Sequence, residues 1–79
     1  MVDIRTMVCE IVSSEFNLPS TELVMGMTLE EMGADSLDLV QLAMTIEEEF
    51  DVEIGNGVEQ RWRTVEDVVD TVRVEMWWI

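Results

Sequence analysis

The sequence predicts an all-α fold, a small four-helix bundle with three main helices, one short helix and a long loop between helices one and two. Apolar residues recur at helical spacing in three stretches, and the only proline of the chain lies between the first two of them. A chain of 79 residues is small, and folding buries only about 60% of the surface that a chain of this size exposes when unfolded. We therefore expect one domain, residues 1–79, with a thin core.

The first predicted helix runs from Asp3 to Phe16. Its apolar residues recur every three or four positions, and charged residues fall between them. The apolar positions are Ile4, Met7, Val8, Ile11 and Val12.

Residues 17–35 are predicted to form a long connection, because they contain the proline and two glycines among isolated apolar residues. Connections of this length are usually functional or contain a short element. Thr28 and Glu31 have the spacing of a capping box, in which each residue's side chain accepts a hydrogen bond from the other's backbone amide. We predict one helical turn from Thr28 to Met32, with Leu29 and Met32 in the core.

The second main helix is predicted over residues 36–50, which contain good helix formers and neither glycine nor proline. Gly33 allows a tight turn before it, and Asp35 is a preferred N-cap residue. Asp38 lies in the first turn, where the helix dipole favours a carboxylate. Ser36 is therefore expected at the head of this helix.

The remaining sequence predicts a short helical turn over residues 58–62 and a last main helix. A break at residues 55–57 precedes the turn, and Thr64 has the position of an N-cap. The last helix has one apolar stripe, formed by Val65, Val68, Val69, Val72 and Met76.

The charge of the chain is strongly negative. Eighteen acidic residues against four arginines give a formal net charge of −14 at pH 7. Binding to nucleic acid is excluded as a function, because it depends on cationic side chains that meet phosphates. The charge favours partners with basic surfaces and accelerates encounters with them. The alternative interpretation is a solubilising acidic surface with no specific partner.

The composition argues against an enzyme. The chain has no His, Lys or Tyr to move protons near neutral pH, so catalysis would depend on carboxylates alone. A single cysteine, Cys9, forms no internal disulfide and has no histidine partner for metal binding or nucleophilic catalysis. We interpret Cys9 as a small helix residue and expect no metal site. No secretory signal or membrane span is visible, so we expect a cytoplasmic protein or a mature organelle form.

The second main helix has two apolar stripes on opposite faces. The first contains Leu39, Leu42, Ile46 and Phe50, and a thin core can use only one such stripe. We expect the other face to meet solvent or partners, as a docking helix on which apolar residues give contact and charges give steering. The alternative is a helix buried on both sides. The predicted docking face contains Leu37, Val40, Gln41, Met44, Glu47 and Glu48.

The head of this helix is suited to a phosphate ester on Ser36. First-turn backbone amides lack helical partners, and the positive end of the dipole stabilises an anion. The carboxylates of Asp35 and Asp38 would repel that anion unless a divalent cation is bound between them and the phosphate. An Asp-Ser-Leu helix start is common in proteins, so plain helix capping is the alternative explanation.

Two stretches of the chain resemble the acyl carrier protein family. Residues 29–40 read LEEMGADSLDLV, and within them Gly-Ala-Asp-Ser-Leu-Asp is similar to the attachment sequence of phosphopantetheine. Residues 46–54 read IEEEFDVEI and are similar to the end of the family's second helix. The resemblance implies a four-helix carrier without catalytic activity.

The resemblance also implies the chemistry of the site. A phosphopantetheinyl transferase, using Mg²⁺ only during transfer, moves a 4′-phosphopantetheine arm from coenzyme A to Ser36. Asp35 corresponds to the residue that helps to hold the metal and the transferase, and Leu37 and Asp38 belong to the same attachment sequence. The arm holds acyl groups as thioesters for acyl synthases and transferases with basic surfaces. The space between the second and third helices shelters the acyl chain. We expect a monomer that serves fatty acid synthesis or a dedicated polyketide or lipid pathway.

Four features depart from the family pattern. Gln41 replaces a usual glutamate, and residues 55–57 read Gly-Asn-Gly in place of a Pro-Asp-Glu-like run. Trp62 replaces a smaller aliphatic residue and is expected to reduce or reshape the acyl cavity. Residues 76–79, Met-Trp-Trp-Ile, are expected in the core or in self-association. These departures favour a dedicated pathway over a housekeeping role.

Three other functions are weighed against this one. An interaction domain with the same fold would leave Ser36 unmodified. A peptidyl carrier shares the fold and the serine, but the acidic composition and the Gly-Ala-Asp-Ser context favour acyl cargo. A calcium-binding loop of the EF-hand type fails over residues 51–62, because glycine, asparagine and tryptophan occupy loop positions 5, 6 and 12.

Overall fold

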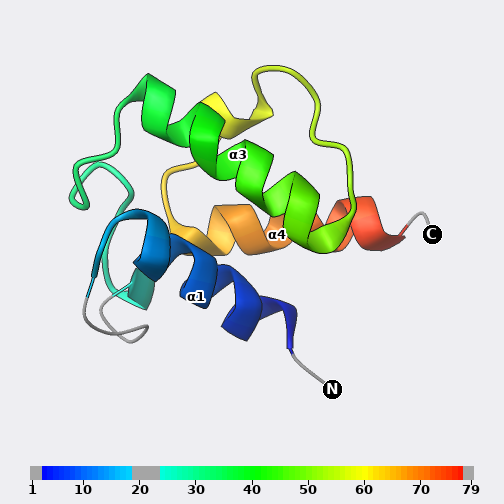
Figure 1. The fold of residues 1–79 in the computed structure, drawn as a ribbon, viewed down its shortest axis with the longest axis horizontal. Helices are drawn as coiled ribbons and strands as arrows, with labels where there is room; N and C mark the ends of the chain where they lie inside the picture. Colours follow the sequence, from blue (N-terminus) through cyan, green and yellow to red (C-terminus); the bar gives the residue numbers. More distant parts are fainter. Residues whose placement is uncertain (1–2, 19–23, 78–79) are drawn as a thin grey trace.

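The computed structural model describes residues 3–18 and 24–77 (Figure 1). Within this part of the chain the elements are α1 (Ile4–Glu15), α3 (Ser36–Phe50), the 3₁₀ helix η1 (Val58–Arg61) and α4 (Val65–Trp77). Helix α1 contacts both α3 and α4, and η1 contacts α3. The predicted all-α class, with three main helices and a short one, is confirmed. No helix of the described segments is long and apolar enough to cross a membrane.

The core is made mostly of small branched side chains, contributed by α1, α3, α4 and the connections between them. Leu42 and Ile46 of α3 meet valines of α1 and α4, as the predicted stripes require. Met76 differs from the prediction, because the core residues of α4 end at Val72 and Met76 is 37% exposed. The buried cluster comprises Val8, Cys9, Val12, Val24, Leu29, Leu42, Ala43, Ile46, Trp62, Val65, Val68, Val69 and Val72.

The connection between α1 and α3 contributes more to this core than the sequence indicates. Val24 is helical and fully buried, although it stands in the sequence as an isolated apolar residue. The predicted turn after it is confirmed, with Leu29 buried and Met32 packed against the core. Pro19, Trp78 and Ile79 lie outside the described residues.

Three capping boxes organise the chain. Thr28 pairs with Glu31, Asp35 with Asp38, and Thr64 with Asp67, and in each pair the two side chains accept hydrogen bonds from each other's backbone amides. The first and third are adjacent, because Thr28 and Thr64 form an isolated antiparallel bridge. The start of the predicted turn is thereby fixed to the start of α4.

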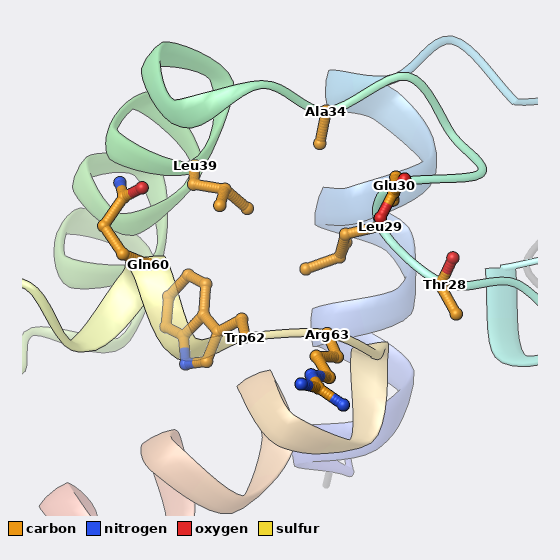
Figure 2. Close-up of a pocket in the computed structure, with 8 residues that line it drawn as sticks. All are labelled: Thr28, Leu29, Glu30, Ala34, Leu39, Gln60, Trp62 and Arg63. Carbon is orange, nitrogen blue, oxygen red and sulfur yellow. The ribbon is translucent and has the colours of Figure 1, made fainter.

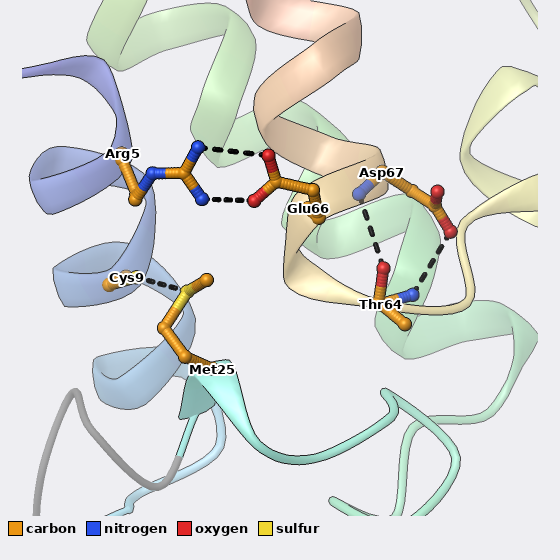
Figure 3. Close-up of polar contacts among 6 residues, drawn as sticks. All are labelled: Arg5, Cys9, Met25, Thr64, Glu66 and Asp67. Atoms are coloured by element: carbon orange, nitrogen blue, oxygen red, sulfur yellow. Dashed lines mark hydrogen bonds and ion pairs between the residues drawn. The ribbon is translucent and has the colours of Figure 1, made fainter.

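Arg5 and the single cysteine, Cys9, both contact side chains from other segments of the fold (Figure 3). Arg5 of α1 forms a two-pronged ion pair with Glu66 of α4, in which Arg5 Nη2 lies 2.9 Å from Glu66 Oε1. The hydrogen bond to Glu66 raises the pKa of Arg5. Cys9 Sγ lies 3.2 Å from Met25 Sδ, and burial raises the pKa of the Cys9 thiol. The thiol stays protonated at neutral pH, which agrees with a packing role rather than reactivity.

The Thr64–Asp67 box makes stability dependent on pH. The backbone amides of Arg63 and Thr64 donate to Asp67 Oδ2 at 2.8 and 3.1 Å, and these hydrogen bonds lower the pKa of Asp67. A carboxyl with a lowered folded pKa stabilises the fold above its unfolded pKa of about 3.9, and this stabilisation is lost as the pH falls through the folded value.

We therefore predict that Asp67→Asn destabilises the protein at pH 7, because the neutral amide accepts these hydrogen bonds less strongly. The free-energy difference from wild type should narrow as the pH falls from 5 to about 3. Chemical unfolding of both proteins across this range measures it. Asp70→Asn, at an exposed position one turn later on α4, is the control. A difference that is constant with pH would contradict the assignment.

Candidate functional site

Ser36 is the first residue of α3, and its position is fixed by the turn that precedes it. Gly33 donates its amide to Glu30 O at 2.9 Å and has φ +92°, a left-handed conformation that favours glycine. Ala34 donates to Leu29 O at 3.1 Å, which ties the approach to the buried turn. The chain then enters α3 with Ser36 exposed to solvent.

The two predicted neighbours of Ser36 form the capping box of α3. Asp35 Oδ1 accepts from the Asp38 amide at 2.9 Å, and Asp38 Oδ2 accepts from the Asp35 amide at 3.1 Å. One oxygen of each carboxylate is therefore directed at the backbone. An N-cap of this kind stabilises a helix by about 1 kcal/mol. The predicted roles of Asp35 as N-cap and of Asp38 in the first turn are confirmed.

A residue that the sequence did not indicate lies beside Ser36. Gln60 of η1 donates Nε2 to the backbone oxygen of Ser36 at 3.2 Å and thereby holds η1 against the head of α3. Its position is 24 residues later in the chain, and the sequence between the two contains no pattern that would pair them.

A partly open cavity of about 570 Å³ adjoins the head of α3 (Figure 2). Side chains of Leu29, Ala34, Leu39 and Trp62 lie around one space, contributed by the connection, α3 and the segment after η1. Ser36 itself does not line the cavity, but Gln60 of the lining donates a hydrogen bond to its backbone oxygen, so the cavity lies near the head of α3. The lining residues are Thr28, Leu29, Glu30, Ala34, Leu39, Gln60, Trp62 and Arg63.

Helix α3 has one buried and one exposed apolar face. Leu42 and Ile46 are fully buried, whereas Leu37, Val40 and Met44 are 77%, 41% and 50% exposed. The alternative of a helix buried on both sides is therefore wrong.

The polar members of the predicted docking face differ in their exposure. Gln41 and Glu48 are exposed, but Glu47 is half-buried and its Oε2 accepts from the Ile54 amide at 3.0 Å.

The exposed head of α3 can present a group that is attached to Ser36. The chain has no histidine, and the carboxylates nearest to Ser36 each cap the helix rather than accept a proton from the serine. Among the described residues no group of three or more His, Cys, Asp or Glu side chains could hold a metal ion. The free amides and dipole of the first turn fit the phosphate of an ester on the serine hydroxyl.

Comparison with known proteins identifies the family to which this capped helix head and its exposed serine belong. The family model described as "phosphopantetheine attachment site" matches residues 7–72, which include Ser36 and all the elements from α3 to η1. The chain therefore belongs to the acyl carrier protein, phosphopantetheine attachment family, and is a non-catalytic carrier.

Known proteins agree with this assignment. The chain is 40% identical over 68 residues to the chloroplastic acyl carrier protein 3 of Cuphea lanceolata, covering 85% of this chain and 48% of that protein. It thus spans about half the length of that relative. It is 36% identical over 65 residues to the acyl carrier protein of Clostridium acetobutylicum, covering 81% and 84%. The crystal structure of an acyl carrier protein from Thermotoga maritima superposes with a TM-score of 0.62 at 27% identity, covering 91% and 94%.

Proposed function

We propose that Ser36 carries the 4′-phosphopantetheine arm and that the protein passes acyl thioesters between enzymes of fatty acid synthesis or of a dedicated polyketide or lipid pathway. The observation that carries this proposal is the capped head of α3, which exposes Ser36 near a partly apolar cavity whose lining residue Gln60 donates a hydrogen bond to the serine backbone. The relatives named above are acyl carrier proteins, which supports acyl rather than peptidyl cargo. A covalently bound arm supplies the thiol that this chain lacks at the site.

The residues around Ser36 have distinct proposed roles. The Ser36 hydroxyl is the acceptor, and the transferase provides the base and the Mg²⁺ that its activation needs. Asp35 uses one oxygen for the cap, which leaves its other oxygen for the metal and the transferase. Asp38 keeps the first turn in place through the Asp35 amide. Leu37, 77% exposed beside the serine, gives the transferase an apolar contact.

The exposed face of α3 is the proposed docking surface for acyl synthases and transferases. Leu37, Val40 and Met44 supply apolar contact, and Glu48 and the net charge of −14 attract basic partner surfaces. Gln41 lies on the same face and contributes hydrogen bonding without charge. Glu47 has a second role, because its bond to Ile54 holds the segment after α3.

The setting of this carrier is also proposed. The chain works as a monomer in the cytoplasm or, like the chloroplastic relative, in an organelle. The departures at Gln41, at residues 55–57 and at Trp62 favour a dedicated pathway over general fatty acid synthesis.

Ser36 is the residue that should carry the arm. Incubation with coenzyme A, Mg²⁺ and a broad-specificity phosphopantetheinyl transferase should increase the intact mass of the wild type by one phosphopantetheine. Ser36→Ala should gain nothing, whereas Ser14→Ala, which removes an exposed serine of α1, should gain the full mass. If folded wild type gains no mass in a reaction that loads another carrier protein, the proposed carrier function is wrong. The alternative of an unmodified interaction domain is then favoured.

Substitutions on the exposed face of α3 should weaken docking to a synthase. Met44→Ala and Glu48→Lys should each raise the KM of a synthase for the loaded carrier about fivefold, because an apolar contact or a favourable charge worth about 1 kcal/mol is lost. Both variants should still be loaded at Ser36. Val74→Ala and Asp70→Lys make the matching changes on the exposed side of α4 and should leave KM unchanged. Equal effects at both helices would place docking elsewhere.

A further inference from the structure

Trp62 occupies an unusual position between the cavity and α4 (Figure 2). Its side chain lines the cavity, yet the residue is only 5% exposed. Its Nε1 donates to Thr71 Oγ1 at 2.9 Å, and that hydroxyl in turn donates to the backbone oxygen of Asp67 at 3.1 Å. The indole is therefore tied through one hydroxyl to the backbone of α4.

The hydrogen bond to Thr71 makes the Trp62 indole resist displacement from the side of the cavity. Rotating the ring away from the cavity would break the bond to Thr71 and leave a largely buried N–H without an acceptor, which is costly. An aliphatic side chain at the same position has no polar atom to lose and can change rotamer to admit a longer guest. The chain thus holds the α4 side of the cavity fixed.

The lining of the cavity shows how far an apolar guest can be sheltered. Glu30, Gln60 and Arg63 are exposed and form its rim, and Gln60 lies against Ser36. Only Leu29 and Trp62 of the lining residues are buried, so they form its deepest part. An acyl chain that enters across this polar rim would meet Leu29 and the Trp62 indole as the buried parts of the lining.

We propose that Trp62, held by Thr71, is the end wall that limits the cavity to short acyl groups and leaves the distal part of long chains outside. This inference rests on the proposed attachment of the arm to Ser36. Trp62 acts on the length of the cargo, through contact with its end, and has no part in attachment.

The test compares acyl groups of increasing length on three proteins. Wild type, Trp62→Leu and Thr71→Val are loaded from the corresponding acyl-coenzymes A, and loading at Ser36 is verified by mass. For each variant the melting temperature of the acyl form is compared with that of its own unacylated loaded form, so that any destabilisation by the substitution cancels. Each sheltered methylene should raise the melting temperature by up to about 6 °C.

In wild type the gain should stop at a short chain length, whereas Trp62→Leu and Thr71→Val should continue to gain with longer chains. Thr45→Val makes the same change on α3, away from the cavity lining, and should behave as wild type. Thr71→Val keeps the tryptophan and removes only the acceptor of its hydrogen bond. It therefore tests the role of that hydrogen bond even where Trp62→Leu folds poorly. A gain that stops at the same length in wild type and both variants overturns the end-wall role alone. A wild type that is never loaded at Ser36 overturns the proposed function and this inference with it.

Discussion

The use of acidic side chains as helix caps is the constraint on which the rest of this structure depends. A chain with 18 acidic residues and four arginines has few partners for its carboxylates, and its self-repulsion opposes compactness. The fold places four of these carboxylates where they accept hydrogen bonds from backbone amides at the start of a turn or helix, namely those of Glu31, Asp35, Asp38 and Asp67. There the negative charge stabilises the backbone, because the amide end of a helix is positive.

These caps also build the site. The box at Asp35 fixes the direction of α3 and therefore the exposure of Ser36. The boxes at Thr28 and Thr64 are joined by a backbone bridge, which sets the connection against the segment before α4 and forms one wall of the cavity. Local hydrogen bonds around the head of α3 thus position Ser36, whereas the cavity also depends on the bridge between Thr28 and Thr64 and on the segment around η1. A thin core of small side chains holds the three main helices together.

The features that sequence predicted are those whose causes are local. The helices follow from apolar periodicity, and the caps at Thr28, Asp35 and Thr64 follow from residues three positions apart. The exposure of Met44 opposite Ile46 follows from the helical repeat and the limited core. The roles of Ser36 and of the docking residues remain predictions, because they depend on molecules that the chain meets.

Features that depend on distant parts of the chain could not be predicted. The contact of Gln60 with Ser36 joins positions 24 residues apart, and the bond from Trp62 to Thr71 requires α4 to pack behind the indole. Val24 is a single apolar residue whose burial depends on helices that come before and after it. Met76 follows the stripe of α4 in sequence, but the core does not extend to it. Each outcome is decided by tertiary packing, which periodicity alone does not describe.

The central claim is that Ser36 and the adjoining cavity form one carrier site, and amide chemical shifts test it most directly. Proton–nitrogen correlation spectra of the protein would be compared before loading, with the arm alone, and with a short acyl group on the arm. The account predicts that the arm shifts the amides of residues 34–39, and that the acyl group then shifts Leu29, Leu39, Trp62 and the Trp62 indole. Arm-dependent shifts centred on another serine, or an acyl group that leaves the cavity residues unchanged, would contradict it.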